Sequence, residues 1–403
     1  YVGMGADLAL HFNCARSPWD FAADYDFLGT AKLHEIAFPA SAYDDDTRRT
    51  QSARLNQTEN TQPAIAVVAL AHLRMLQALG IKADCMAGHS FGELMALHAA
   101  GSLSERNTVQ LARLRGLACA AASSESQGTM LAVFANKETI EKYVEDLGKK
   151  IVIANENTCE QLVLAGERNN ILQAQEVLGK HGVKTTELPV SAAFHSSLVA
   201  QATEHLVDGI DKCELNAPRM PVYSNKTTTL YPDNTRETRK LLAAQLANPV
   251  RFREMIENMY NDGVRTFIEV GPSNVLSRFV SSILGKKSHL VVALDNKRRR
   301  GVTAANSAIG ALCVHGYEMN LEALWSDTFP EAPQPKPSNH ELMLNGANYH
   351  KPYPANAISF NDPGFDNRST LRVLLECTAV TAPVSTVERA LATTSTISAA
   401  NDV

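Results

Sequence analysis

Residues 83–100 read Ala-Asp-Cys-Met-Ala-Gly-His-Ser-Phe-Gly-Glu-Leu-Met-Ala-Leu-His-Ala-Ala. A short apolar run ends at Gly88-x-Ser90-x-Gly92, and a helical pattern follows. Strand, tight turn and helix around a serine form the nucleophile-elbow pattern, in which small neighbours let a strained turn present the hydroxyl. We therefore predict an α/β protein with Ser90 at a sharp turn, although a serine that merely caps the helix is the alternative.

Two helical patterns flank this turn. Residues 61–79 are expected to form a buried helix with Thr61 as its N-cap. Residues 105–122 are expected to form another helix, opened by a capping box of Ser102 and Glu105. A serine turn between two such helices is far more specific than an isolated GxSxG match.

The segment 128–188 has an order of its own. Its patterns predict strand, helix, strand, strand, helix and strand, which is the βαββαβ order of a ferredoxin-like unit. Regular α/β sequence then resumes, with helical patterns over 197–212 and 236–261 and buried strands at 266–270 and 290–294 that are typical of a parallel sheet. We therefore expect a small subdomain inserted into a larger α/β domain.

The composition excludes several classes of protein. A net charge of -5 and a pI near 6.2 indicate no basic face for nucleic acid. The sequence contains neither a membrane-spanning apolar stretch nor a signal peptide, so we expect a cytoplasmic protein that does not bind membranes. The seven cysteines are scattered without a CxxC pair, which predicts reduced thiols and no disulfide framework or zinc site.

A serine hydroxyl needs a base to become nucleophilic at neutral pH, and histidine has the matching pKa. Among the 12 histidines, His195 is the preferred candidate because it lies in a loop that leaves the predicted subdomain. From its position alone, His195 is equally compatible with a surface or packing role. His89 adjoins the serine but is expected to pack on the opposite side of the turn.

Two arginines on the helix at 105–122 are candidate anion-binding groups. Arg113 and Arg115 are two residues apart, so at most one of them points inward. An inward guanidinium suits a substrate carboxylate, whereas a solvated or structurally paired arginine is the alternative. The basic run Lys297–Arg300 fits either phosphate groups or an acidic protein surface, or is simply a solvated loop.

Further short motifs occur in a fixed order along residues 1 to about 325. They are Gln62-Pro63-Ala64, Gly88-His89-Ser90-Phe91-Gly92-Glu93, Arg115-Gly116, Asn155-x-Asn157 with Gln161 and Gly166, Phe194-His195-Ser196, Gln245-Leu246-x-Asn248-Pro249-Val250 and Glu269-Val270-Gly271-Pro272. In this order they resemble the malonyl-CoA:acyl carrier protein transacylase family, which includes the acyltransferase domains of fatty acid and polyketide synthases.

The resemblance implies a catalytic pair. Ser90 would be the acylated nucleophile and His195 its base. The backbone carbonyl of Gln245 would orient His195, so the site would be a dyad without an acidic third member. The backbone N–H of Phe91 would be one oxyanion donor.

The resemblance also implies a substrate-binding set. Arg115 would clamp the malonyl carboxylate, with Gln62, His89 and Phe194 beside it. The ending Ala193-Phe194-His195 is similar to that of malonyl-selective synthase domains. The family implies no metal and no bound cofactor: malonyl-CoA is a substrate, and phosphopantetheine arrives on the acyl carrier protein.

The family implies a hydrolase-like parallel-sheet core, expected at residues 1–127 and 196–325, with the ferredoxin-like subdomain at 128–195. Residues 326–403 are expected to be a linker, rich in proline at first and largely irregular or disordered toward the end. The family's first strand, with a Gly-Gln-Gly motif that supplies the second oxyanion donor, is expected upstream of Tyr1.

Finer features are similar to the acyltransferase of multidomain polyunsaturated fatty acid synthases. These are the Phe91 that follows the nucleophile and the stretch 344–349 (Leu-Asn-Gly-Ala-Asn-Tyr). Enediyne-type and other iterative polyketide synthases are close competitors. In either context a ketosynthase would precede this chain and carrier domains would follow it.

Two rival functions are compatible with the elbow. A thioesterase of the α/β-hydrolase class would place an acid and then a histidine after the serine, with Asp262 or Asp295 as the acid and His289 or His315 as the histidine. An inactive docking module would keep the fold and lose the activity. The inward arginine and the inserted subdomain disfavour the thioesterase.

Overall fold

The computed structural model describes residues 1–24, 32–125, 128–144, 150–188, 192–196, 199 and 204–325. The chain divides into two compact units, Tyr1–Ala332 and Pro333–Val403, and all described residues lie in the first. The predicted linker at 326–403 lies outside the described residues. In the described part of the chain, every helix is too short or too polar to cross a bilayer.

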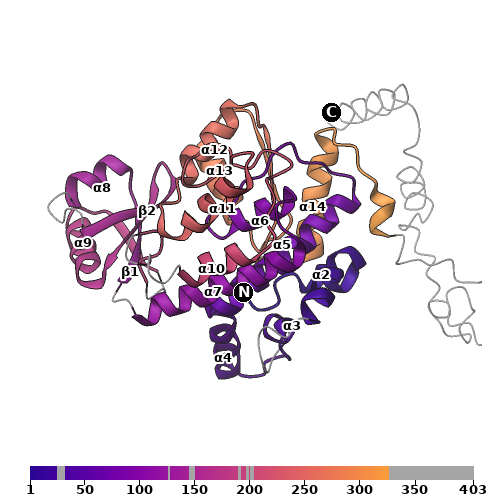
Figure 1. Cartoon of the computed structure of the whole chain (residues 1–403), viewed down its shortest axis with the longest axis horizontal. Coiled ribbons are helices and arrows are strands. Elements are labelled where there is room, and N and C mark those ends of the chain that lie inside the picture. The colour runs from indigo at the N-terminus through magenta and orange to yellow at the C-terminus, as the bar shows by residue number, and fades with distance from the viewer. Residues whose placement is uncertain are drawn as a thin grey trace, which may run out of the picture. The chain divides into compact units, whose positions relative to one another are not determined.

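In the described part of the chain, a run of helices precedes the first strand, and short strands are then mixed with further helices (Figure 1). They are α1 (Ala6–His11), α2 (Asn13–Ala23), α3 (Leu33–Ala37), α4 (Asp45–Asn56), α5 (Thr58–Ala78), α6 (Gly92–Ala99), α7 (Glu105–Glu125), β1 (Gly128–Phe134), α8 (Lys137–Val144), β2 (Ile151–Thr158), β3 (Gln161–Glu167), α9 (Arg168–Lys180), β4 (Lys184–Glu187), α10 (Glu204–Lys212), α11 (Thr235–Ala244), the 3₁₀ turn η4 (Gln245–Ala247), α12 (Phe252–Asn261), β5 (Thr266–Glu269), α13 (Val275–Leu284), β6 (Leu290–Ala293), α14 (Gly301–Val314) and η5 (Leu321–Leu324).

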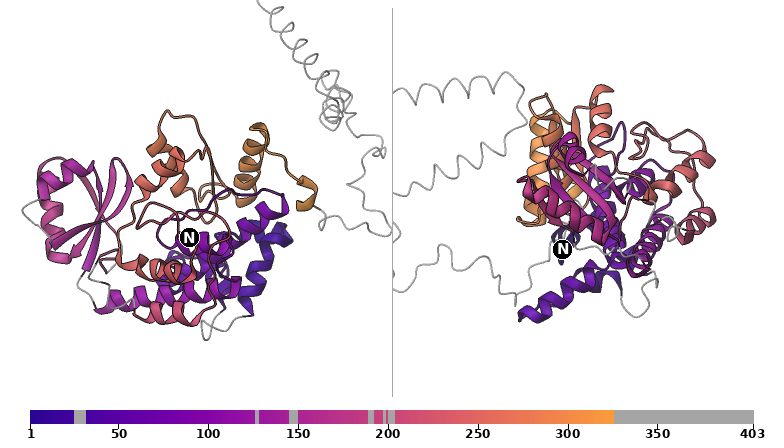
Figure 2. Two further views of the ribbon diagram at one scale, coloured as in Figure 1. Left: turned by 45° about the horizontal axis from the view of Figure 1, so that its top comes forward. Right: turned by 90° about the vertical axis from the view of Figure 1, so that its left-hand side faces the viewer.

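The elements β1 to β4 form an antiparallel sheet of four strands in the order β2-β3-β1-β4. With α8 and α9 they follow the expected order βαββαβ and gather at one end of the described unit (Figure 1). The helices cover one face of the sheet, as Figure 2 shows, through a cluster that includes Leu131, Ile140 and Ile171. The other face packs on Ala193, so the sheet supports the segment that carries His195.

The long helix α5 forms the centre of the larger part of the fold. Its side chains are buried on nearly all sides, including Ala64, Val67 and Leu70. Pro63 removes one backbone donor inside this helix. The carbonyl four residues earlier, on Glu59, instead accepts a hydrogen bond from Arg113 Nη1 at 2.7 Å, which lets the helix continue.

The strands β5 and β6 pair in parallel, as predicted, with Thr266 opposite Leu290. The predicted strand at 83–87 is reduced to one parallel bridge between Met86 and Val222. Residues on either side of Met86 make no further ladder contacts among the described strands, so the elbow follows an extended segment held at a single point.

The helical pattern at 236–261 is broken in the structure. Helix α11 ends at Ala244, η4 follows, and α12 begins at Phe252. Pro249 lacks a backbone N–H, and the residue before a proline disfavours the helical region, which explains the break. The break exposes the carbonyl of Asn248, and Val250 pairs with β2 by accepting from the Glu156 N–H at 2.8 Å.

The predicted cap residues of two helices were wrong, although α7 begins at Glu105 as predicted. Helix α5 begins at Thr58, and the Thr61 hydroxyl donates to the Leu55 carbonyl instead of capping the helix. In α7 the cap is Ser104, whose Oγ accepts from the Asn107 N–H at 3.1 Å, while Ser102 is buried before the helix. Both contacts are local, three and six residues apart along the chain, so neighbouring residues decided the partner of each side chain.

Candidate active site

Ser90 lies at the tight turn between the Met86 bridge and α6. Its φ is 50°, in the left-handed region that non-glycine residues rarely adopt. Gly88 makes this turn possible, because a Cβ there would lie 2.0 Å from the Gly92 backbone carbon. The strained conformation directs the Ser90 hydroxyl away from the start of α6, as the elbow pattern predicts.

Asn225 holds this turn from outside, and no sequence pattern pointed to it. Its Oδ1 accepts from the Ser90 N–H at 2.7 Å, and its Nδ2 donates to the Gly88 carbonyl at 2.6 Å. Its own backbone N–H donates to Glu93 Oε1 at 3.1 Å. The sequence carried no signal for this contact, because 135 residues separate Ser90 from Asn225.

Glu93, in the first turn of α6, is 1% exposed. Burial raises the pKa of its carboxyl to about 7, and the nearby hydroxyls of Tyr231 and Ser224 and the hydrogen bond from the Asn225 N–H oppose the rise. The acid side chain therefore contributes a hydrogen-bond acceptor to the turn and only part of a negative charge near neutral pH.

His195 meets Ser90 as predicted. Its Nε2 lies 2.7 Å from Ser90 Oγ, and the ring is 4% exposed. Like Ser90, His195 has a left-handed backbone, with a φ of 59°. Its backbone N–H donates to the Leu246 carbonyl at 3.0 Å, which fixes the loop on η4.

The expected orienting group, the Gln245 carbonyl, needs correction. Nδ1 of His195 hydrogen-bonds to the backbone carbonyl of Asn248 at 3.0 Å. The backbone carbonyl of Gln245 also raises the pKa of the ring, but by less than the Asn248 carbonyl does. The reason is the Pro249 break, which frees the Asn248 carbonyl from helical pairing. This bond places the proton on Nδ1 and leaves Nε2 free to accept the serine proton.

Burial lowers the pKa of His195 to about 3, and the charges of Arg115 and His89 lower it further, while the carbonyls of Asn248 and Gln245 oppose the shift. The ring is therefore neutral at pH 7 and able to act as a base. No carboxylate among the described residues contributes to the pKa of His195, which leaves a serine–histidine pair without an acid.

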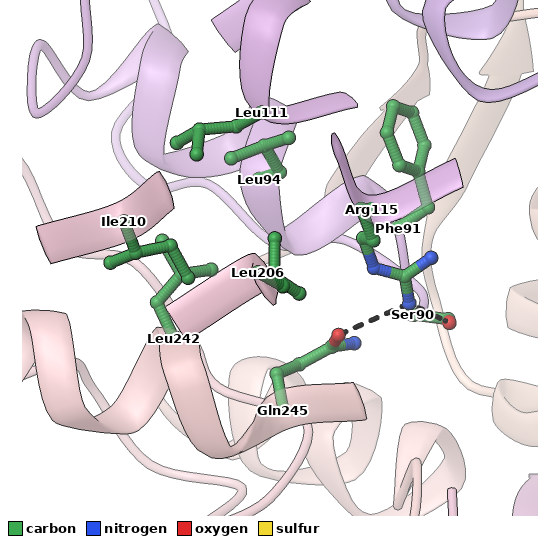
Figure 3. Close-up of a pocket in the computed structure, with 9 residues that line it drawn as sticks. All are labelled: Ser90, Phe91, Leu94, Leu111, Arg115, Leu206, Ile210, Leu242 and Gln245. Carbon is green, nitrogen blue, oxygen red and sulfur yellow. Dashed lines mark hydrogen bonds between the residues drawn. The ribbon is translucent and has the colours of Figure 1, made fainter. Parts of the chain in front are cut away.

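Arg115 is the inward member of the arginine pair, with 6% of its surface exposed. Its Nη1 donates to Gln62 Oε1 at 3.0 Å, and its Nη2 donates to Ser90 Oγ at 3.1 Å and to Gln245 Oε1 at 3.2 Å (Figure 3). All three acceptors are uncharged. Burial lowers the pKa of the guanidinium, which nevertheless stays protonated because arginine titrates far above neutral pH.

The pocket beside Arg115 is apolar and narrow. Its free space is about 10 Å³, enough for roughly one water molecule. Figure 3 shows Ser90, Arg115 and Gln245 at one end of it, with aliphatic side chains at the other. The aliphatic lining consists of Leu94, Leu111, Leu206, Ile210 and Leu242. A buried cation with such neighbours favours an anionic ligand.

The remaining predicted residues surround this centre. Gln62 is buried against Arg115, as described. His89 lies behind the turn, where its Nε2 is 2.7 Å from Asn157 Oδ1 on β2 and its ring packs against Phe252. Phe194 is partly buried among apolar clusters beside His195. The Phe91 ring lies 5.9 Å from the Arg115 guanidinium.

The residues of the rival hydrolase triad do not contact Ser90. Asp262 accepts from Tyr223 Oη at 2.6 Å, and buried Asp295 accepts from the Ser273 N–H at 2.7 Å. The rings of His289 and His315 hydrogen-bond to backbone carbonyls of their own surroundings. The basic run at 297–300 is exposed in the loop before α14. Among the described residues, no group of three or more His, Cys, Asp or Glu side chains could hold a metal ion.

Comparison with known proteins adds to this geometry. Residues 3–310 match the acyl transferase domain family. The chain is 34% identical over 289 residues to the malonyl CoA-acyl carrier protein transacylase of Bacillus subtilis strain 168, covering 70% of this chain and 86% of that protein. It is 28% identical over 277 residues to a polyunsaturated fatty acid synthase subunit of a Thraustochytrium species, covering 68% of this chain and 10% of that protein.

A solved structure gives a further comparison. It is the complex of a type II polyketide synthase acyl carrier protein with its malonyl-transacylase, and the match has a TM-score of 0.66 and 28% sequence identity. The alignment covers 76% of this chain and 96% of that chain. The structural neighbours share mixed α and β content with the described unit.

Proposed function

This chain belongs to the acyl transferase domain family, and we propose that it moves a malonyl group from malonyl-CoA, through Ser90, to the phosphopantetheine thiol of an acyl carrier protein. It is a malonyl-CoA:acyl carrier protein transacylase. The transfer uses no cofactor beyond its substrates, because the carrier brings the phosphopantetheine. The observation that carries the residue roles is the 2.7 Å contact between Ser90 Oγ and His195 Nε2, with Arg115 on the same oxygen.

In the first half of the reaction, Ser90 Oγ attacks the thioester carbonyl while its proton passes to His195 Nε2. The backbone N–H of Phe91 faces the developing oxyanion at the start of α6. The carbon–sulfur bond then breaks, and the leaving coenzyme A thiolate takes the proton from His195. The product of this half is malonyl-Ser90.

In the second half, the carrier thiol gives its proton to His195 and attacks the acyl-serine carbonyl. The bond to Ser90 Oγ breaks, and the serine recovers the proton. The hydrogen bond from His195 Nδ1 to Asn248 supports both halves, because it keeps the same ring nitrogen available. Arg115 binds the malonyl carboxylate, and Gln62 and Gln245 hold the guanidinium in place.

Two further residues belong to this proposal. Phe194 packs beside His195, and in similar synthase domains this position accompanies selection of malonyl over methylmalonyl units. His89 contacts the turn from behind and acts on the substrate through the position of Ser90.

Intact-mass measurement tests the function. The purified chain is exposed briefly to malonyl-CoA beside a Ser90→Ala control, and the carrier protein is then added. We expect a malonyl adduct on the wild type alone, which the carrier thiol discharges. Free malonate without an adduct would instead indicate a hydrolase, and neither product would indicate a docking module.

The proposed setting is a multidomain polyunsaturated fatty acid or polyketide synthase, with carrier domains as partners and a ketosynthase as neighbour. The likeness to the Thraustochytrium synthase protein supports the first of these settings. This chain spans about a tenth of that protein, so the likeness concerns one domain and not the activity of the whole synthase.

We also propose an architecture of a hydrolase-like parallel-sheet core, residues 1–127 and 196–325, with a ferredoxin-like subdomain at 128–195. The strand order β2-β3-β1-β4 and the element order βαββαβ support the subdomain. The parallel pair β5–β6 and the parallel bridge at Met86 support the core.

A further inference from the structure

The guanidinium of Arg115 contacts the nucleophile itself. One nitrogen, Nη2, donates both to Ser90 Oγ at 3.1 Å and to Gln245 Oε1 at 3.2 Å. The same Ser90 Oγ lies 2.7 Å from the base, His195 Nε2. A buried cation and the buried base therefore share one oxygen atom.

This arrangement opposes the first chemical step. When Ser90 loses its proton, His195 becomes an imidazolium, and a second positive charge forms beside Arg115. In a buried site such charges repel strongly, because little water screens them. A hydrogen bond from Arg115 also occupies a lone pair of the attacking oxygen.

The groups around the pair offset this repulsion only in part. Arg115 and His89 are the charged or titratable groups that act on His195, and both disfavour its protonated form, while the carbonyls of Asn248 and Gln245 favour it. Glu93, on α6, is the carboxyl that raises the pKa of Arg115, and burial raises the pKa of Glu93 itself to about 7. Cys119, on α7, is held neutral because burial raises its thiol pKa. The partners of Arg115 supply dipoles and no full charge.

We propose that the malonyl carboxylate activates the catalytic pair as well as anchoring the substrate: it draws Arg115 from Ser90 and supplies the negative charge that lets His195 accept the serine proton. This inference rests on the proposed function. In a malonyl thioester, a single methylene group separates the carboxylate from the carbonyl that Ser90 attacks. One guanidinium therefore reaches the carboxylate while the carbonyl lies at Ser90 Oγ. Selection for malonyl then acts on the rate of acylation, beyond its effect on binding.

The activating role of the carboxylate does not alter which bonds form and break during acylation. The Ser90 Oγ–carbon bond forms as the proton passes to His195, and the thioester bond breaks as the thiolate recovers that proton. The carboxylate stays ionised throughout and is neither consumed nor modified.

The test is single-turnover acylation of Ser90 at saturating substrate, with malonyl-CoA and malonamyl-CoA compared. The two substrates have nearly the same shape, but an uncharged amide replaces the carboxylate in the second. We expect the saturating acylation rate constant to fall by about 100-fold or more with the amide, in line with the usual contribution of a general base. Equal rate constants with a difference only in the half-saturating concentration would overturn the inference.

A variant supplies the converse measurement. In Arg115→Met the cation is removed while an unbranched apolar side chain, shorter than arginine by the guanidinium end, remains. We expect the saturating rate constant for malonamyl-CoA to rise by about tenfold, because the repulsion on His195 disappears. A rate constant that stays the same or falls in the folded variant would overturn the inference.

The two experiments also separate this inference from the proposed function. If the wild type forms no malonyl-Ser90 at all, the proposed function fails. If malonyl-Ser90 forms but the charged and uncharged substrates acylate at one rate, only the activating role of the carboxylate fails. The wild-type comparison stands even if Arg115→Met does not fold.

Discussion

The side-chain amide of Asn225 holds the backbone of Ser90, with its Oδ1 2.7 Å from the Ser90 nitrogen and its Nδ2 2.6 Å from the Gly88 oxygen. One residue thus satisfies a donor and an acceptor that the strained turn leaves unpaired. Ser90 keeps a φ of 50° because the two hydrogen bonds of the Asn225 amide hold the turn in this strained conformation. The Glu93 carboxyl in turn holds Asn225 by accepting from its backbone N–H.

Asn225→Ala is expected to slow acylation at saturating malonyl-CoA by about 10- to 100-fold, because Ser90 Oγ loses its fixed position relative to His195. The free energy of unfolding should fall by about 1–3 kcal/mol, since two buried backbone groups lose a partner. Single-turnover kinetics and urea unfolding measure the two effects.

Asn60→Ala is the matched control, because buried Asn60 also donates to a backbone carbonyl, that of Arg54 at 2.9 Å. It should lower stability without a comparable loss in the acylation rate constant. An equal loss of rate in both variants would show that the effect of Asn225 is one of general stability.

Gly88→Ala should abolish activity and destabilise the fold, because the added Cβ would lie 2.0 Å from the backbone carbon of Gly92. Gly92→Ala is the control within the same motif, since nothing lies within 4 Å of a Cβ there. Gly92 begins α6, where alanine is the better helix former by roughly 1 kcal/mol. Thermal melting of the two variants checks the contrast, and similar melting temperatures would contradict the close approach at Gly88.

The pH dependence of kcat/KM should report the low pKa of His195. Since burial lowers that pKa to about 3, the ring of the free enzyme stays neutral as the pH falls through the range in which an ordinary histidine becomes protonated. We therefore expect kcat/KM for malonyl-CoA to change little between about pH 5 and 8. An acidic limb with an apparent pKa near 6.5 would contradict the burial of this base.

Glu93 should make the protein less stable as the pH rises. Its pKa is raised to about 7 by burial, above the ordinary value of 4.5, so between these values the folded state binds more protons than the unfolded state. Stability is therefore greatest below about pH 4.5, as far as this group is concerned, and is lost up to about pH 7, by roughly 3 kcal/mol. Urea unfolding across this range measures the slope, which Glu93→Gln should reduce.

Local sequence patterns predicted much of the fold because they report on neighbours along the chain. The order of elements in 128–188 followed from alternating apolar runs and helical periods, and the structure contains it. The parallel pair at 266–269 and 290–293 followed from short, continuously apolar runs. The helix predicted over 236–261 was wrong at its centre, where Pro249 outweighed the amphipathic pattern.

The candidate site likewise combines features that local sequence predicted with contacts that form only in the folded chain. The glycines around Ser90 marked the turn, because only small residues permit its geometry. His195 was the preferred base from residue type and position, and the family resemblance selected Arg115 over Arg113, but their contacts with Ser90 join residues 105 and 25 positions apart. The expected role of the Gln245 carbonyl fell to Asn248, whose exposure depends on a broken helix.

The available chemistry could be read along the chain: a serine in a strained turn, a histidine, an arginine and the α/β pattern that carries them. Folding alone established that Asn225 clamps the turn, that Asn248 orients the base, and that Arg115 shares Ser90 Oγ with His195. The physical reason is that periodicity and turn propensity act over a few residues, whereas hydrogen bonds between distant residues depend on how the packed core brings their elements together.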